Sequence, residues 1–161
     1  MRSRDFERLF SEHAEPLFGF LVYRTGDRHQ AEDVLADTFE RALRGRRGFD
    51  RLRGSEKAWL YTIALNCLRD HVRRLGVEER ALARVGGGDE SAPDPGQRAE
   101  QRDMVTRLMA GLSAEEREVV SLRYGADLTV PEIARLLGVP LTTAEGRLAR
   151  ALRRMRAADA L

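Results

Sequence analysis

A glycine- and proline-rich stretch, GGGDESAPDPG at residues 86–96, divides the chain into two parts. It shows no apolar periodicity, and this composition is typical of a flexible linker rather than of a packed element. On both sides of it, apolar residues recur at helical spacing, and no segment alternates convincingly as a strand. We therefore predict an all-α fold with two small helical domains, over residues 1–75 and 99–161, joined by a flexible linker over residues 76–98.

The composition narrows the class of protein. With 42% hydrophobic and 34% charged residues, the chain can bury a core. The N-terminal MRSRDFERLF has no apolar signal region, and no run approaches the roughly 18 apolar residues of a membrane span. We therefore expect a cytoplasmic protein without membrane insertion. The single cysteine, Cys67, excludes an internal disulfide and a multi-cysteine zinc site.

Almost all of the positive charge is arginine, and Lys57 is the only lysine. Arginine makes planar, bidentate contacts with phosphates and guanine edges, which lysine cannot make. The bias is therefore compatible with nucleic-acid binding, although a GC-rich genome produces the same bias.

Three helices are predicted in the first domain. An apolar stripe from Phe6 to Leu21 forms the first, with Pro16 predicting a kink or a break. The second begins at Asp27, an N-cap residue with Gln30 three positions on, as in a capping box. Its predicted buried residues are Ala31, Val34, Leu35, Thr38, Phe39 and Ala42. Its predicted acidic side consists of Asp33, Asp37 and Glu40.

An arginine-rich segment, RALRGRRGFDRLRG at residues 41–54, carries six arginines against a single aspartate. Its three glycines predict a loop rather than a helix. The third helix, WLYTIALNCLRDHVRR at residues 59–74, follows the helical apolar template. Its predicted buried residues are Leu60, Ile63, Ala64, Cys67, Leu68, His71, Val72 and Leu75. Its predicted outward stripe consists of Thr62, Asn66, Arg69, Asp70 and Arg73.

Three capping-box patterns organise the second domain: SAEE at 113–116, TVPE at 129–132 and TTAE at 142–145. In the last of these, Thr142 is the predicted cap and Glu145 its partner. Gly138 predicts the C-terminal end of the helix that TVPE starts.

The two helices on either side of Val139 and Pro140 fit a helix-turn-helix, whose second helix enters the major groove. The spacing of Arg147, Arg150 and Arg154 along one face suits phosphate and base contacts. Such helix pairs also occur in proteins that never bind DNA, and terminal arginines also complement the helix dipole. The capping patterns, tight turn and basic helix together favour DNA binding. The predicted wedge between the helices consists of Ile133, Ala134, Leu137, Val139 and Leu148.

These segments together resemble a bacterial extracytoplasmic-function sigma factor of the sigma-70 family, the type with only two conserved domains. AEDVLADTFERAL resembles the family's Ala-Glu-Asp…Glu-Thr-Phe…Arg-Ala helix, and WLYTIALNCLRDHVRR resembles its Trp-Leu-Tyr-x-Ile-Ala-x-Asn…Asp-x-x-Arg-Arg helix. LSAEEREVVSLRYGADLTVPEIARLLGVPLTTAEGRLARALRRMR resembles the promoter-binding helix-turn-helix of region 4. The resemblance implies a transcription initiation factor, not an enzyme and without a cofactor, that binds core RNA polymerase and directs it to promoters.

The resemblance also assigns roles to residues. The first domain, region 2 of the family, would recognise and melt the −10 element, and the second would read the −35 element as duplex. Asp33 and Asp37 would face the coiled coil of the polymerase β′ subunit, while the second domain would bind the flap of the β subunit. The implied −10 contacts are Asn66, Arg69, Asp70, Arg73, Arg46 and Arg47. The implied −35 contacts are Arg147, Arg150, Thr142, Thr143 and Glu145. An anti-sigma factor is an expected further partner.

The chain departs from the family pattern at two places. Ala36 stands where many members have Gln, which weakens one expected polymerase contact. Glu145 and Gly146 stand where the family often has a basic residue followed by Ser. A carboxylate near phosphates is repulsive but can accept from cytosine N4; alternatively, Glu145 only completes the capping box of Thr142, which we prefer.

Two other functions compete with this interpretation. A helix-turn-helix regulator acting without polymerase would leave the acidic helix and the Asn66 stripe without a role. An enzyme or metal protein could use Cys67 and His71, which lie four residues apart on one helix. Both fall on the predicted apolar stripe, so we expect core residues and no metal site. Trp59 and Tyr61 are likewise expected to pack against neighbouring helices.

Overall fold

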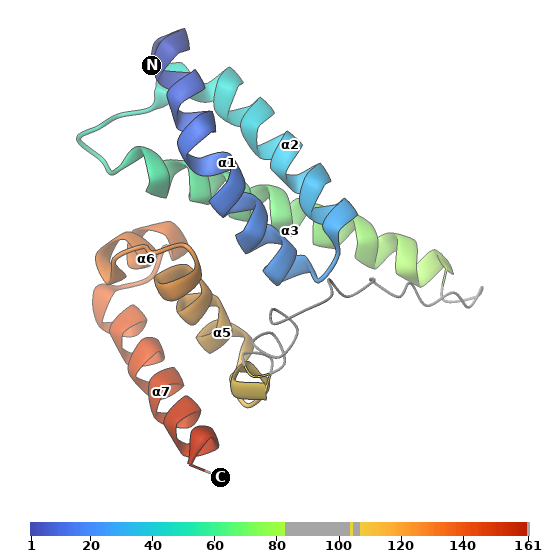
Figure 1. Cartoon of the computed structure of the whole chain (residues 1–161), viewed down its shortest axis with the longest axis vertical. Coiled ribbons are helices and arrows are strands. Elements are labelled where there is room, and N and C mark those ends of the chain that lie inside the picture. The colour runs from blue at the N-terminus through green and yellow to red at the C-terminus, as the bar shows by residue number, and fades with distance from the viewer. Residues whose placement is uncertain (83–103, 105–106, 161) are drawn as a thin grey trace. The chain divides into compact units, whose positions relative to one another are not determined.

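The computed structural model describes residues 1–82, 104 and 107–160, the side chains of 77–82 excepted. Within these residues the secondary structure is helical and contains no strand, as predicted. The chain divides into two compact units, Met1–Ser91 (unit 1) and Ala92–Leu161 (unit 2) (Figure 1). Most of the predicted linker lies outside the described residues. Within those residues, every helix is too short or too polar to cross a bilayer.

Unit 1 contains α1 (Ser3–Thr25), α2 (Arg28–Gly45) and α3 (Glu56–Leu82). α2 packs against both α1 and α3 (Figure 1). α3 starts ahead of the predicted Trp59 and continues beyond residue 75, where we predicted the domain to end. The extension is physically reasonable because Glu, Arg, Ala and Leu, which dominate residues 75–82, all favour helix.

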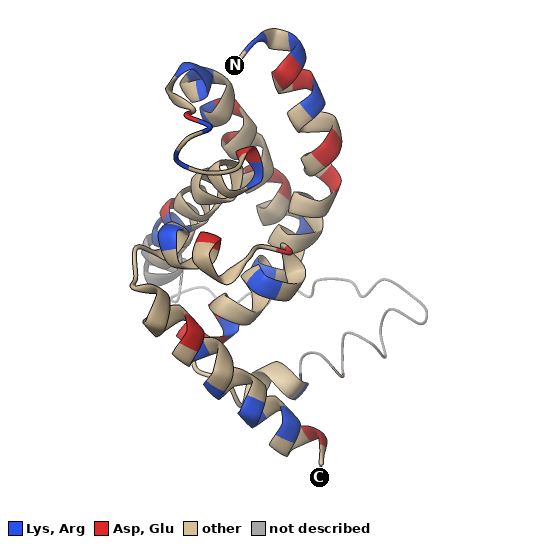
Figure 2. Ribbon diagram, turned by 90° about the vertical axis from the view of Figure 1, so that its left-hand side faces the viewer, with Lys and Arg blue, Asp and Glu red and all other residues tan. Residues whose placement is uncertain are grey.

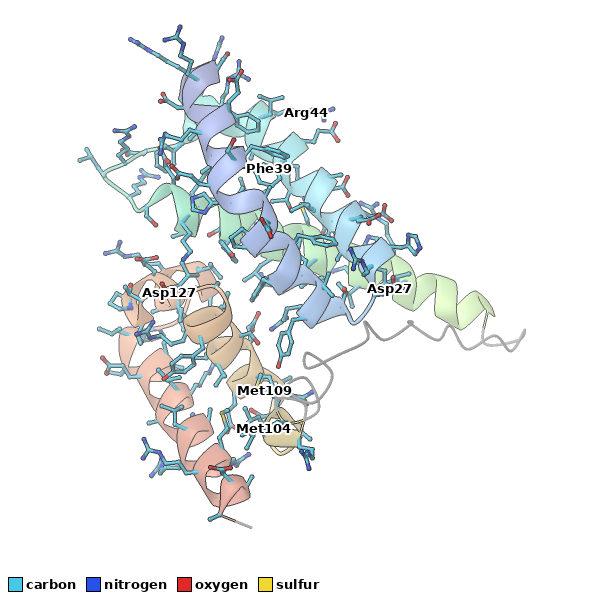
Figure 3. All side chains as sticks on the ribbon, in the orientation of Figure 1. Asp27, Phe39, Arg44, Met104, Met109 and Asp127 are labelled. Atoms are coloured by element: carbon cyan, nitrogen blue, oxygen red, sulfur yellow. The ribbon has the colours of Figure 1, made fainter. Side chains whose placement is uncertain are left out.

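No break occurs at Pro16, because α1 continues through it. Proline removes one backbone hydrogen bond from a helix. The buried residues Leu9 and Leu17, on either side of it, keep both halves of α1 on the core. α1 ends at Gly26, whose φ of 68° is left-handed, and the Asp27 side chain then accepts from the backbone N–H of His29 at 2.8 Å to start α2 (Figure 3).

Aromatic side chains join the helices of unit 1. Phe20 of α1 meets Tyr61 of α3 edge to face, with ring centroids 5.4 Å apart. Phe10 and Phe6 of α1 both pack edge to face against Phe39 of α2 (Figure 3), with ring centroids 4.8 and 6.4 Å from that of Phe39, respectively. The predicted stripe of α2 is confirmed, except that Leu35 is only half-buried.

The predicted buried face of α3 is partly wrong. Leu60, Ala64, Cys67 and Leu68 are buried, but so are Tyr61 and Leu65, whereas Val72 is 58% exposed; Ile63, His71 and Leu75 are half-buried. Both α1 and α2 contact α3, so its buried arc is wider than a single stripe. A periodic pattern shows neither how many helices cover a face nor where that cover ends.

The arginine-rich segment is helical over its first part, which contradicts the predicted loop. α2 continues to Gly45, and a 3₁₀ turn, η1, follows at Arg46–Gly48. Two features keep α2 helical there: Ala42 remains buried, and Arg44 pairs with Glu40 one turn away at 2.6 Å.

Unit 2 contains α5 (Ala114–Val120), a single π-helical turn η2 (Ser121–Gly125), α6 (Val130–Leu137) and α7 (Leu141–Asp159). Its predicted end signals are largely confirmed. Ser113 and Glu116 form a reciprocal capping box, Thr129 accepts from the N–H of Glu132 at 3.3 Å, and Gly138 ends α6 with a φ of 67°. One apolar cluster joins the residues just before α5 to α5 and α7; it consists of Met109, Leu112, Val120 and Ala151, with Leu148 and Met155 packed against it. The other predicted wedge residues are buried (Ile133, Ala134) or half-buried (Leu137, Val139).

The third capping box is wrong. α7 begins at Leu141 after Pro140, so Thr142 lies inside the first turn and does not cap the helix. The carbonyl of Pro140 accepts from the N–H of Thr143 at 3.0 Å, and the φ of Pro140, −59°, already suits a helix start. Thr142 and Glu145 are consequently both exposed rather than engaged in a cap.

Candidate nucleic-acid interface

The predicted outward stripe of α3 is only partly on the surface. Asn66, Arg69 and Arg73 are exposed, whereas Thr62 is half-buried and donates its hydroxyl hydrogen to the Ala58 carbonyl at 2.8 Å. Asp70 is engaged by another helix, as described next. The exposed part of the stripe therefore combines one amide with two guanidinium groups.

Asp70 forms an ion pair across two helices. Its Oδ2 lies 3.0 Å from Nη1 of Arg41 on α2, and both side chains are about 40% exposed. The hydrogen bond from Arg41 to Asp70 is the largest cause of the raised pKa of Arg41. Asp70 thus has a structural partner, which sequence spacing did not indicate.

Residues 49–55 connect η1 to α3, and side chains at the start of α3 contact this segment. The rings of Phe49 and Trp59 contact each other in a tilted arrangement, with ring centroids 5.3 Å apart. The Glu56 carboxylate accepts two hydrogen bonds from Arg8, each 3.1 Å, and lies 3.7 Å from Arg51. The tip is left free, because Leu52 is 95% exposed.

Leu52 is a candidate that sequence reasoning missed. An apolar residue in a non-helical segment has no periodic partner, so nothing in the pattern distinguishes a buried from an exposed position. The only available signal is its place between Arg51 and Arg53.

Tyr61 and Cys67 of α3 belong to the core, as predicted, whereas Trp59 and His71 are not fully buried. Tyr61 is 1% exposed, and burial raises its pKa to about 12. Trp59 is half-buried against Phe49. Cys67 is buried, and this burial raises its thiol pKa. His71 is half-buried, and among the described residues no three His, Cys, Asp or Glu side chains are grouped to hold a metal ion.

The acidic side of α2 lies opposite its buried stripe, as predicted. Asp33 and Glu40 are exposed and Asp37 is half-buried. Glu40 pairs with Arg44 at 2.6 Å.

On α7 the structure separates residues that we predicted to share one face. Arginine bands recur along the helix (Figure 2). Arg147 is 18% exposed and pairs with Glu115 of α5 at 3.6 Å, and Arg154 pairs with Glu116 at 3.3 Å. Arg150 is exposed and has no ion pair within the described part of the chain.

The outward face of α7 lies opposite the fully buried Ala144 and Ala151. Its exposed residues are Thr142, Glu145, Ala149, Arg150, Arg153 and Arg156. Thr143 is half-buried at its edge. Arg153 is a further candidate, and its spacing of three residues from Arg150 was the available sequence signal.

Comparison with known proteins assigns both units to one protein family. Residues 9–77 match the family described as Sigma-70 region 2, and residues 102–155 match Sigma-70, region 4. The chain belongs to the sigma-70 family. The ECF RNA polymerase sigma factor SigL of Mycobacterium tuberculosis is 33% identical over 150 residues, covering 92% of this chain and 85% of SigL. SigM of Bacillus subtilis, also an ECF sigma factor, is 26% identical over 94% of this chain and 93% of SigM.

Solved structures agree with this assignment to the sigma-70 family. The sigma factor RpoE of Bartonella quintana, in complex with the anti-sigma factor NepR, superposes with a TM-score of 0.80 at 25% identity, covering 98% of both chains. CnrH, in complex with the cytosolic domain of CnrY, gives a TM-score of 0.71 at 25% identity, covering 97% of this chain and 88% of CnrH.

The chain is thus an extracytoplasmic-function sigma factor, a transcription initiation factor that directs core RNA polymerase to promoters. The family acts without catalysis of its own. A regulator working without polymerase would leave the region 2 match, over residues 9–77, unexplained.

Proposed function

We propose that this sigma factor contacts one melted −10 strand through Asn66 and the −35 duplex through Arg150. The −10 part of the proposal rests on the exposure of Asn66, which Arg69 and Arg73 follow on the same stripe of a helix whose thiol and phenol groups are buried. Capturing an unstacked base requires hydrogen bonds to its edge, and an amide offers both a donor and an acceptor.

The arginines around Asn66 would hold the strand's phosphates. Arg69 and Arg73 follow on the same stripe, and both are exposed. Arg46 and Arg47 of η1 complete the proposed set; the Arg46 guanidinium also donates to the Leu43 carbonyl at 2.8 Å. Phosphate contacts of this kind fix register and supply most of the salt-dependent affinity.

Asp70 and Leu52 have different proposed roles. Asp70 acts on the DNA surface by holding Arg41, since a carboxylate alone would repel phosphates. Leu52, almost fully exposed on an anchored segment, is suited to contact a base face, as apolar wedges do in other DNA-bending proteins.

On the −35 side, the outward face of α7 offers Arg150 and Arg153 for phosphates and guanine edges. Thr142 and Thr143, in the first turn of α7, would contact the DNA backbone. Because Glu145 does not cap the helix, its exposed carboxylate is free to accept from cytosine N4. We therefore propose that Glu145 contributes to sequence preference.

Protein partners complete the proposal. Asp33 and Asp37, on the side of α2 away from the core, would contact the β′ coiled coil, and unit 2 would contact the β flap. The complex of RpoE with the anti-sigma factor NepR supports an anti-sigma partner for this chain as well. Co-expression with products of neighbouring genes tests this, since an anti-sigma factor would copurify and inhibit run-off transcription.

The deciding experiment is run-off transcription with core RNA polymerase on genomic fragments, followed by the variants Asn66→Ala and Arg150→Ala. Asn66→Ala should reduce strand opening, seen as permanganate reactivity of −10 thymines, more than it reduces duplex binding. Arg150→Ala should reduce binding of −35 duplex. Arg4→Ala, which removes an exposed arginine of α1 that has no proposed DNA contact, is the matched control. Equal activity of Asn66→Ala, Arg150→Ala and Arg4→Ala on all fragments would refute the assignment.

A further inference from the structure

Two ion pairs join α7 to the first turn of α5. Arg147 Nε lies 3.6 Å from Glu115 Oε2, and Arg154 Nη1 lies 3.3 Å from Glu116 Oε2. Arg147 and Arg154 are two helical turns apart, and Ala151, which is fully buried, lies between them. The pairs therefore flank a fully buried position of α7.

In each of these ion pairs, one side chain is largely buried and the other is exposed. The Glu116 side chain is 6% exposed and also accepts from the Ser113 N–H at 3.2 Å in the capping box. Arg147 is 18% exposed, whereas Glu115 is 68% exposed. Each pair thus has one largely buried member, whose position is fixed by its surroundings.

We propose that Arg147 and Arg154 are positioning residues: with Glu115 and Glu116 they set the rotation of α7, so that its outward face meets the −35 element. Arg147 then acts through Glu115 and not through a DNA phosphate. This inference rests on the proposed −35 role of the outward face. It changes the role that the family resemblance gave to Arg147.

The direction in which one substitution changes DNA affinity distinguishes a positioning role from a direct contact. Glu115→Gln removes a negative charge near DNA, so electrostatics alone would leave binding unchanged or tighten it. If the Glu115–Arg147 pair positions α7, the same substitution weakens binding. The expected loss is roughly two- to fivefold, as for an ion pair with one exposed member.

The experiment uses holoenzyme assembled from core RNA polymerase and the full chain. The probe is a fluorescent promoter duplex recovered from the run-off fragments, and affinity is measured against KCl concentration. Glu115→Gln, Arg147→Gln and their combination should weaken binding to a similar extent without changing the salt dependence. Arg154→Gln should also weaken binding. Asp159→Asn, which removes an exposed carboxylate from the end of α7, is the matched control and should not weaken binding.

Two results would overturn the positioning role: unchanged or tighter binding by Glu115→Gln, or a salt slope lowered by about one in Arg147→Gln, as expected for a lost phosphate contact. Thermal unfolding by circular dichroism checks that the variants remain folded. The double variant Glu115→Arg with Arg147→Glu exchanges the two charges. It should bind the promoter duplex more tightly than the single variants if the ion pair positions α7, and no such recovery would contradict the positioning role. Arg150→Gln separates the two proposals, because its failure to weaken binding would instead reject the −35 surface.

Discussion

Unit 1 and unit 2 stabilise their helices by different means. The helices of unit 1 have 23, 18 and 27 residues, and aromatic pairs join them. α5 and α6 of unit 2 have only 7 and 8 residues. Tyr124 is the only aromatic residue after Tyr61, and it is 57% exposed. Side-chain caps and interhelical ion pairs occur in both units, at Asp27 and between Arg41 and Asp70 in unit 1. In unit 2, the caps at Ser113 and Thr129 and the ion pairs between α5 and α7 act without any aromatic pair among the described residues.

This difference has a physical basis. Long helices bury a continuous apolar face, so core packing dominates their stability. In a helix of two turns, a large share of the backbone groups lies at the ends, where capping is needed to satisfy them. Unit 1 should therefore respond most to loss of core volume and unit 2 to loss of caps.

The largest expected effect is that of Leu21→Ala in α1. Leu21 is fully buried, and truncation of a buried leucine costs about 3 kcal/mol through lost transfer energy and a cavity. Urea unfolding followed by fluorescence measures it, because the single tryptophan, Trp59, lies in unit 1. Ile133→Ala, an equally buried site in unit 2, is the control. If it shifted the Trp59 midpoint as much, the two units would not unfold independently.

An intermediate effect is expected at high pH. Burial raises the Tyr61 pKa from 10.0 to about 12, so the unfolded chain loses this proton at lower pH than the folded chain. The stability of unit 1 should hold below pH 10 and fall by about 2 kcal/mol as the pH rises through 12. Tyr61→Phe should reduce this loss, measured as urea midpoints across the pH range. A Tyr61→Phe profile identical to wild type would show that another group causes it, and Tyr124→Phe in unit 2 serves as control.

The smallest effect distinguishes a true cap from an apparent one. Thr129→Ala removes the acceptor of the Glu132 N–H and should cost about 1 kcal/mol, seen as a lower thermal midpoint of unit 2 by circular dichroism. Thr142→Ala has the same chemistry at a position that does not cap, so its cost should stay below about 0.5 kcal/mol. Equal losses would mean that α7 starts at Thr142 in solution.

The sequence was sufficient to predict features that depend only on neighbouring residues, such as most helix ends. Asp27, Ser113, Thr129 and Gly138 marked helix ends correctly, because a cap depends on only a few neighbouring backbone groups. The prediction for Thr142 was wrong for an equally local reason: the helix already starts after Pro140, two residues earlier, whose carbonyl accepts a hydrogen bond from the N–H of Thr143. The exposure of Asn66 also followed from helical spacing alone.

The sequence by itself thus determined the helices, most of their ends and the family motifs. Only the tertiary structure decided which charged residues are paired within the protein. Arg41 and Asp70 are 29 residues apart, and Arg154 and Glu116 are 38 apart, so no local pattern brings them together. It also decided that Tyr61 is buried and Val72 exposed, because burial depends on how many helices cover a face and how far they extend.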